Sequence, residues 1–230
     1  MSVRNSAELL GSGGPFATAL DGFAPREAQI QMADAVQEAI ESGDSLVVEA
    51  GTGIGKTLAY LVPALLSGEK VIVSTGTKTL QDQLFFRDLP LVREALESSV
   101  TTALLKGRSN YLCLHRMRTA RTEGRLPSRD AVEELEAVLD WSAQTRDGDL
   151  SISGVVSEES GLMPFVTSTA DNCLGSECPE FDNCFVAQAR REAQEADVVV
   201  VNHHLLFADM AIKQSGFGEV LPGAAVFIVD

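Results

Sequence analysis

The most constraining feature of the sequence is a glycine-rich octapeptide that follows a short apolar run. Its residues are Ala50, Gly51, Thr52, Gly53, Ile54, Gly55, Lys56 and Thr57. The glycines let the backbone take positive φ angles and approach an anion closely, and successive amides at a helix start form a phosphate cradle. Lys56 can place a charge on the β- and γ-phosphates, and the Thr57 hydroxyl can ligate Mg²⁺. The octapeptide predicts a strand, loop and helix that bind ATP or GTP; the alternative is a glycine turn that happens to precede Lys-Thr.

Short apolar runs alternate along the chain with stretches of helical periodicity. Five runs indicate strands, at residues 46–48, 71–73, 101–105, 198–201 and 226–229. Helices are indicated at residues 25–42, 57–66 and 79–89. We expect Pro90 to close the last helix. Continuous β-branched runs are typical of strands buried on both faces of a parallel sheet, so the pattern predicts an α/β fold with one open sheet.

The stretch from residue 106 to about residue 195 breaks this alternation. It contains all four cysteines, a basic segment and a helical piece at 131–141, followed by an irregular part rich in Gly, Ser and Pro. Because strands resume after it, we interpret it as an insertion into one α/β domain. The expected organisation is a flexible lead-in at 1–22, the first part of the domain at 23–105, the insert at 106–195 and the continued domain at 196–230.

The charge balance is acidic, with 33 Asp and Glu against 18 Lys and Arg and a net charge of −15. This balance argues against a protein that coats nucleic acid through a broadly basic surface. One segment departs from it and contains a single acid, Glu123. Its basic residues are Lys106, Arg108, Arg116, Arg118, Arg121, Arg125 and Arg129. The segment is either a narrow track for a nucleic-acid backbone or the solvated face of a helix.

No stretch of the sequence has the pattern of a signal peptide or a membrane span. Residues 1–14 are small and polar, without the apolar core of a signal peptide. The longest apolar runs, near 58–66 and 198–201, are too short to cross a bilayer. We therefore expect a cytoplasmic protein without membrane contact, in which thiols stay reduced.

The cysteines are unevenly spaced: Cys113 stands alone, whereas Cys173, Cys178 and Cys184 lie close together in the sequence. Such clustering indicates a metal or cluster site. Four thiolates can hold Zn²⁺ or a [4Fe–4S] cluster. Structural zinc prefers close cysteine pairs, so the wider spacing favours the cluster and leaves zinc as the alternative. Three histidines are substitute ligands that four cysteines make unnecessary: His115, His203 and His204. For the last two, the alternative is a hydrogen-bonded strand end.

Several segments resemble the motifs of one enzyme family. Residues 23–29 resemble the adenine-reading motif of superfamily 2 helicases, and residues 74–84 resemble the motif that contacts the DNA backbone in that family. Alone, these could be an amphipathic helix start and a polar turn. Residues 226–230, Val-Phe-Ile-Val-Asp, resemble a Walker B strand. The order of phosphate loop, lone cysteine, three cysteines and Walker B strand resembles the XPD-like iron–sulphur helicases. Residues 202–206 resemble the bacterial DinG/YoaA branch, and the sequence around the cysteines is most similar to its YoaA side.

This resemblance implies a RecA-like domain with a parallel sheet, interrupted by an iron–sulphur insert. It implies that Arg26 and Gln29 contact the nucleotide, that Lys56 and Thr57 act in catalysis, and that Asp230 holds Mg²⁺ together with Thr57. The four cysteines would ligate the [4Fe–4S] cluster. In the family the residues after the Walker B aspartate are Glu-Ala-His, so we expect the sequence to be an N-terminal part of a longer protein.

The expected activity is that of an ATP-dependent 5′→3′ DNA helicase that moves on single-stranded DNA and opens forked duplexes, in DNA repair or replication-stress tolerance. One alternative is a nucleotide-switched binding module that senses redox state or DNA without translocating. Another is a DinG-related nuclease, for which the short stretch before Phe23 is expected to leave no room.

Overall fold

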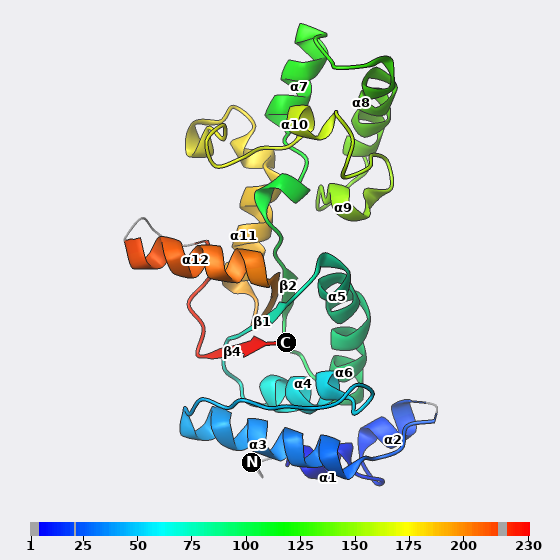
Figure 1. Ribbon diagram of the computed structural model, residues 1–230, viewed down its shortest axis with the longest axis vertical. Helices are drawn as coiled ribbons and strands as arrows, with labels where there is room; N and C mark the ends of the chain where they lie inside the picture. Colours follow the sequence, from blue (N-terminus) through cyan, green and yellow to red (C-terminus); the bar gives the residue numbers. More distant parts are fainter. Residues whose placement is uncertain (1–4, 21, 216–219) are drawn as a thin grey trace. The chain divides into compact units, whose positions relative to one another are not determined.

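The computed structural model describes residues 5–20, 22–215 and 220–230 (Figure 1). The chain divides into two compact units, Met1–Leu104 with Ala193–Asp230, and Leu105–Glu192. We call them the sheet unit and the cysteine unit, and we describe each by itself. None of the described helices is both long and apolar enough to cross a bilayer.

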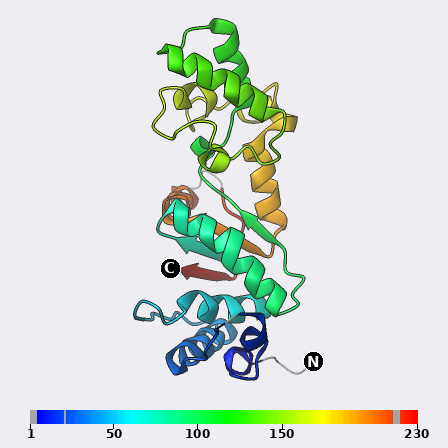
Figure 2. The same ribbon diagram turned by 90° about the vertical axis from the view of Figure 1, so that its right-hand side faces the viewer.

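Four parallel strands form one sheet in the sheet unit, in the order β2-β3-β1-β4 (Figure 2). Their bounds are β1 Val71–Thr75, β2 Thr102–Leu104, β3 Val198–Asn202 and β4 Val226–Val229. Val71 of β1 lies opposite Val198 on one side and Val226 on the other. Every residue of β1 and β3 is buried, as is typical of strands covered on both faces. The predicted parallel α/β sheet is confirmed, with four of its five strands.

The predicted strand at 46–48 is wrong. Leu46, Val47 and Val48 form no strand, and they are 43%, 97% and 39% exposed. They belong to a loop that faces β4 across a cavity of about 500 Å³. Apolar residues favour a strand only where a neighbouring edge accepts their backbone hydrogen bonds and their side chains find a packed surface. Here the loop does not pair with β4, and its apolar residues stay exposed.

The helices of the sheet unit cover this sheet and supply most of the unit's core. Their bounds are α1 Ser6–Leu10, α2 Pro15–Ala19, α3 Glu27–Ser42, α4 Lys56–Leu66, α5 Lys78–Gln83, the π-helical turn η1 Leu84–Asp88, α6 Leu89–Ala95 and α12 His203–Ser215. The helices predicted at 25–42 and 57–66 are confirmed as α3 and α4. Pro90 does not close a helix: it lies in the first turn of α6, which follows directly on the π-helical turn η1.

Residues 5–20, within the expected flexible lead-in at 1–22, contain the short helices α1 and α2. Asn5 caps α1 by accepting a hydrogen bond from the backbone N–H of Ala7. Leu10 and Phe16 are fully buried and belong to the same apolar cluster as Leu61 of α4. Two short helices form because each contributes one large apolar side chain to an existing core.

The cysteine unit consists of short helices and turns. Their bounds are η2 Arg108–Asn110, α7 Leu114–Glu123, α8 Arg129–Ser142, α9 Leu150–Ser153, α10 Met163–Val166, η3 Gly175–Glu177, η4 Phe181–Asn183 and the first part of α11 Phe185–Glu195. The helix predicted at 131–141 is confirmed as α8. Leu135 and Val138 of α8 are buried, as are Leu150 and Leu162. Apolar residues spaced singly along the sequence therefore provide a small core of their own.

Candidate functional site

The phosphate loop lies directly before α4 and takes the conformation of an anion cradle. Gly53 and Gly55 have φ angles of 81° and 90°, whereas Gly51, expected to do the same, does not have a positive φ. Gly55 is the N-cap of α4, and no side chain caps the helix there. The first amides of α4 are therefore without a side-chain acceptor, which is the arrangement that binds phosphate at helix starts.

Lys56 folds back over this loop. Its Nζ donates hydrogen bonds to the carbonyl oxygens of Ala50 (3.2 Å) and Gly51 (3.3 Å). The ammonium group thus lies over the loop, where a bound phosphate would be reached by a small rotation of a flexible side chain. Thr57 follows in the first turn of α4, with its side chain partly buried.

Arg26 and Gln29, which the resemblance assigned to the nucleotide, both donate hydrogen bonds to the phosphate loop. Gln29, 3% exposed on α3, donates from Nε2 to the carbonyl oxygen of Gly55 at 3.0 Å. The Arg26 guanidinium donates to the carbonyl oxygen of Gly53. A Cβ on Gly55 would lie 2.2 Å from the Gln29 amide nitrogen, so both φ and space favour glycine at this position. Contact of Arg26 and Gln29 with a nucleotide stays a prediction.

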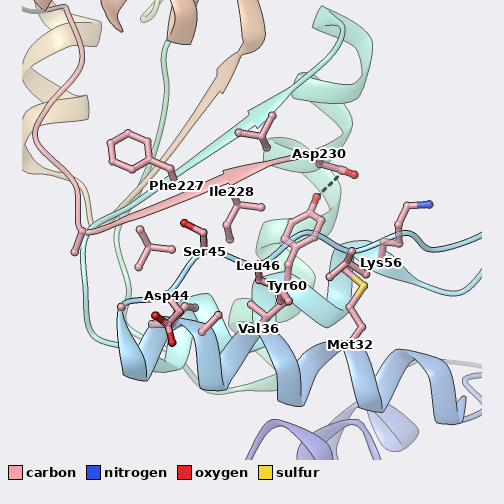
Figure 3. A pocket seen from close by; sticks show the side chains of 17 residues that line it. Met32, Val36, Asp44, Ser45, Leu46, Lys56, Tyr60, Phe227, Ile228 and Asp230 are labelled. Carbon is pink, nitrogen blue, oxygen red and sulfur yellow. Dashed lines mark hydrogen bonds between the residues drawn. The ribbon is translucent and has the colours of Figure 1, made fainter.

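Asp230 lies at the carboxyl end of β4, beside the phosphate loop's helix. The Tyr60 hydroxyl on α4 donates a hydrogen bond to Oδ2 of Asp230 at 2.9 Å (Figure 3). The Asp230 backbone N–H donates to the carbonyl oxygen of Ser74 at 2.9 Å. A tyrosine of α4 and a residue of β1 therefore fix both the side chain and the backbone of this carboxylate.

Tyr60 also connects the two expected magnesium ligands. Burial raises the pKa of the Tyr60 phenol far above its ordinary value, and the charge of Asp230 and the hydrogen bond to it raise the pKa further. A hydrogen bond with the Thr57 side chain opposes these effects on the pKa. The phenol consequently stays protonated at neutral pH and acts as a donor to Asp230. A hydroxyl and a carboxylate are oxygen ligands of the kind that Mg²⁺ uses beside substrate phosphates.

The segment that resembles a DNA-contact motif begins at the carboxyl end of β1. Ser74 Oγ and Nδ1 of His203 are 2.7 Å apart and hydrogen bonded. Thr77 caps α5 by accepting from the backbone N–H of Leu80 at 3.2 Å. His203 was interpreted either as a substitute metal ligand or as a hydrogen-bonded residue at a strand end. The structure shows the hydrogen bond. In a parallel sheet the carboxyl ends of the strands share one edge, which is where ligands of open α/β sheets bind.

The four cysteines are free thiols, each partly buried, at the ends of short elements of the cysteine unit. Burial raises the pKa of the Cys113 thiol, a hydrogen bond with the backbone of Arg116 lowers it, and the other three thiols raise it further. The other three sulfurs are therefore close enough to Cys113 to act on it electrostatically. In the described part of the chain, no three His, Cys, Asp or Glu side chains are already arranged around a common metal position.

The basic segment differs from the continuous track that its sequence suggested. Lys106 is buried in an ion pair with Asp149, with Nζ and Oδ2 2.8 Å apart. Arg118 pairs with Glu180. Further partners engage Arg108, Arg116 and Arg129. Among the described residues, Arg121 and Arg125 are the exposed cations of this segment that keep no partner. Lys106, whose charge is matched by Asp149 inside the protein, is therefore not available to a phosphate.

The sequence of the chain is similar to those of known helicases. Residues 28–120 match the DEAD/DEAH box helicases. This part of the chain is therefore similar to a DEAD/DEAH box helicase domain. It is 57% identical to the ATP-dependent DNA helicase YoaA of Escherichia coli K12 over 94% of the chain and 34% of that protein. It is 50% identical to YoaA of Haemophilus influenzae over 97% of the chain and 35% of that protein.

A more distant relative has the same extent. The ATP-dependent helicase DinG of Mycobacterium tuberculosis H37Rv is 39% identical over 93% of the chain and 35% of that protein. The chain spans about a third of the length of the curated relatives it matches. The resemblance to the DinG/YoaA helicases that the motifs indicated is confirmed.

Three residues with structural roles were not singled out from the sequence. Tyr60 and Ser74 hold Asp230, and Asp149 pairs with Lys106. Tyr60 lies three residues after Thr57 and four after Lys56, so its place on the same face of α4 was available as a signal. Ser74 was identified only as part of a DNA-contact motif. Asp149 had no signal, because a single aspartate in a polar stretch does not reveal that it will neutralise a buried lysine.

Proposed function

We propose that the protein is an ATP-dependent DNA helicase that moves 5′→3′ on single-stranded DNA and opens duplexes at forks. The supporting observation is the phosphate loop before α4, with Lys56 over it and Asp230 at the adjacent strand end. Phosphoryl transfer requires positioning and charge stabilisation rather than covalent chemistry. The loop amides and Lys56 would bind the β- and γ-phosphates, and Thr57 and Asp230 would hold Mg²⁺.

The test is unwinding of forked DNA by the full-length protein with ATP and Mg²⁺. We expect a duplex with a 5′ single-stranded tail to be opened, and one with only a 3′ tail to be left paired. Lys56→Ala is the negative variant. Arg87→Ala is the control, because the Arg87 side chain is 74% exposed and, among the described residues, pairs with its neighbour Asp88 alone. DNA binding that responds to ATP without strand separation would instead establish a nucleotide-switched binding module.

Nuclease activity is checked in the same reactions. One relative, from Bacillus subtilis, bears the name 3′-5′ exonuclease DinG and is 32% identical over 92% of this chain. We expect the labelled strands to keep their full length, with and without ATP. Shortening of the strands that persists in Lys56→Ala would establish a nuclease independent of the phosphate loop.

We further propose that Cys113, Cys173, Cys178 and Cys184 hold a [4Fe–4S] cluster. The support is the donor set: four free thiols in one unit, with spacings along the sequence wider than those of structural zinc. When bound, the cluster would cross-link the turns around η3 and η4 to the start of α7. Elemental analysis of the protein purified without oxygen is expected to find about four irons per chain. One zinc and no iron would contradict the cluster.

The DNA substrate defines the remaining parts of the proposal. Arg121 and Arg125 are exposed and would contact the phosphates of a single strand, which is a narrower contact than the sequence suggested. A role in DNA repair or replication-stress tolerance and a cytoplasmic location follow from such a substrate. Both would be tested by sensitivity of a deletion strain to replication inhibitors and by fractionation of cells.

A further inference from the structure

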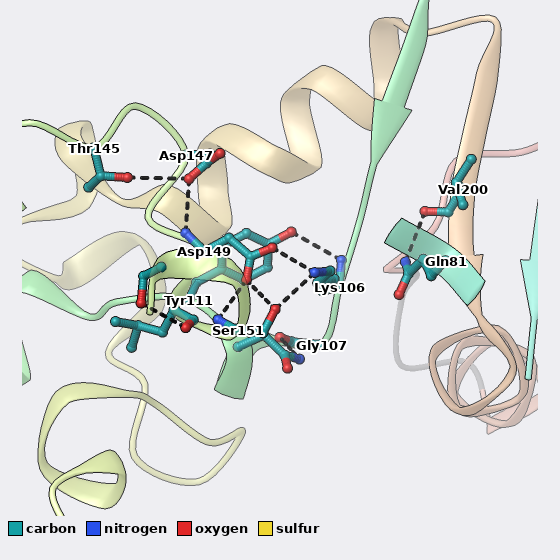
Figure 4. Close-up of polar contacts among 12 residues, drawn as sticks. Gln81, Lys106, Gly107, Tyr111, Thr145, Asp147, Asp149, Ser151 and Val200 are labelled. Carbon is teal, nitrogen blue, oxygen red and sulfur yellow. Dashed lines mark hydrogen bonds and ion pairs between the residues drawn. The ribbon is translucent and has the colours of Figure 1, made fainter. Parts of the chain in front are cut away.

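A buried ion pair lies in the cysteine unit and is not used by the proposed chemistry. The Lys106 side chain is 0% exposed and that of Asp149 is 5% exposed, with Nζ and Oδ2 2.8 Å apart (Figure 4). Lys106 Nζ also donates to Ser151 Oγ at 2.8 Å. Ser151 in turn donates to Oδ1 of Asp149 from its backbone N–H (3.0 Å) and its hydroxyl (2.5 Å). A buried charge is tolerated only with such partners, so this network allows one arrangement of the loop at 147–151.

The same loop holds the segment that leads to Cys113. The Tyr111 hydroxyl accepts a hydrogen bond from the backbone N–H of Lys106 at 3.0 Å. Tyr111 also forms an antiparallel bridge with Asp149. The backbone N–H of Leu112 donates to the carbonyl oxygen of Gly148 at 2.8 Å. The two residues before Cys113 are thereby fixed to the loop.

The loop also touches the residue after Cys184. Gly148 has φ of +66°, and a Cβ there would lie 2.3 Å from ring atoms of Phe185. Phe185 begins α11 and is 9% exposed. A side chain on Gly148 would have to displace this ring and, with it, the start of the helix next to Cys184. One loop therefore contacts the neighbours of two cysteines that are far apart in the sequence.

We propose that the loop at 147–151, locked by Lys106 and Asp149, sets the relative positions of Cys113 and Cys184 before any metal is bound. Lys106, Gly148 and Asp149 are then positioning residues of the metal site, and Lys106 is not a DNA contact. This inference rests on the proposal that the cysteines hold a metal. Partners that orient metal ligands in this way change metal affinity by about 10- to 100-fold when they are removed.

The first experiment measures metal affinity in the full-length protein. Metal-free protein is titrated with Co²⁺, whose thiolate complexes absorb visible light, for the wild type, Asp149→Asn and Gly148→Ala. We expect each variant to bind Co²⁺ about 10- to 100-fold more weakly, while ATP affinity is unchanged. Glu133→Gln is the control, because it removes one partner of the exposed Arg129–Glu133 pair in the same unit. Wild-type affinity in both variants would overturn the inference.

A second measurement needs no metal and separates this inference from the metal proposal. With Cys173 and Cys178 replaced by serine, Cys113 and Cys184 are the two of these four cysteines that a short bifunctional thiol reagent can still join. We expect fast joining in this background and about tenfold slower joining when Gly148→Ala is added, in line with the expected loss of metal affinity. Circular dichroism shows whether that variant is still folded. Equal joining rates in two folded proteins would refute the positioning role, whether or not the wild type holds metal.

Discussion

Different interactions stabilise the two units of the chain. The sheet unit has one large apolar cluster, in which valines of β1 and β3 pack against α4 and α6. The cysteine unit has short helices, a small core and a buried polar network around Lys106 and Asp149. Apolar packing is tolerant of modest change, whereas a buried charge network fails when one member is lost. The nucleotide site therefore lies in the unit that tolerates substitution better, and the cysteines lie in the unit that tolerates it less well.

The largest effect expected from this difference is the loss of ATP hydrolysis in Lys56→Ala. Removing the charge that stabilises the transferred phosphate should slow hydrolysis by about 10²- to 10³-fold. Metal content should stay at the wild-type value, because Lys56 contacts only its own loop among the described residues. Steady-state ATPase assays and elemental analysis are made on one preparation. Loss of metal together with hydrolysis would show that the two units are not independent.

Cys173→Ser is the reciprocal change. We expect metal binding to fall by at least about tenfold, by analogy with the loss of a ligand's supporting partner, and unwinding to fail with it. Nucleotide affinity should be unchanged, since the apolar cluster of the sheet unit is built from residues of that unit. His115→Ala is the control: it removes a neighbour of Cys113 that we do not count as a ligand. Parallel losses of nucleotide affinity and unwinding would mean that the cysteine unit supports the whole domain.

Two leucine truncations compare the cores directly. Leu61 of α4 is 0% exposed and Leu135 of α8 is 3% exposed. Each change to alanine should cost about 2–5 kcal/mol within its own unit. Bound metal should stabilise the cysteine unit in the wild type and in Leu135→Ala alike, because ligand binding stabilises the folded state. Thermal unfolding with and without a chelator is the measurement. If the chelator lowers the unfolding temperature of neither protein, metal does not stabilise that unit.

Tyr60→Phe tests the fine geometry of the sheet unit. It removes the donor to Asp230, and hydrogen bonds to charged groups contribute about 1.5–3 kcal/mol. We expect ATP hydrolysis to need about tenfold more Mg²⁺, with little change in the rate at saturating Mg²⁺. Ser67→Ala is the control, because it removes another hydroxyl hydrogen bond just beyond the end of α4. An unchanged Mg²⁺ requirement would show that Tyr60 does not position Asp230.

The smallest effect concerns Asp197, at the start of β3. Its carboxylate accepts hydrogen bonds from the backbone N–H and the hydroxyl of Thr101, both at 2.7 Å, and these hold its pKa below the ordinary value. A depressed pKa contributes stability above the unfolded pKa, near 3.9, and this contribution is lost as pH falls through the folded pKa. Wild type should therefore be slightly more stable than Asp197→Ala at pH 7, and the gap should close in acid. A gap independent of pH would contradict this assignment.

Local patterns were enough to predict most of the sheet unit. The strands at 71–73 and 198–201 were predictable because valine runs leave few alternatives to a buried parallel strand. The run at 46–48 has the same composition, yet it forms no strand, since pairing depends on a partner that local sequence does not reveal. Helix α8 was predicted as a helical piece at 131–141, and the structure adds Ser128, which caps it by accepting a hydrogen bond from the Ala131 N–H.

Prediction was weakest where function depends on contacts between distant residues. The phosphate loop is contiguous, so its chemistry could be inferred from residue order alone. Lys106 was expected at a basic surface, but its role depends on Asp149, and no rule of spacing connects the two. The same holds for Tyr60 and Asp230, which are 170 residues apart in the sequence. Charge pairs and hydrogen bonds of this range become visible only in three dimensions.

The hydrogen bonds from Gln29 and Arg26 to the phosphate loop have a consequence for nucleotide selection. These side chains donate hydrogen bonds to the carbonyl oxygens of Gly55 and Gly53. The Gln29 hydrogen bond to Gly55 uses one N–H of the amide, and the same amide carries a second N–H and a carbonyl oxygen. Gln29 could therefore engage a base with these groups while it still holds the loop. A base that orients the Gln29 amide would then also fix the position of the phosphate loop, so the two ends of a nucleotide would be coupled through one side chain.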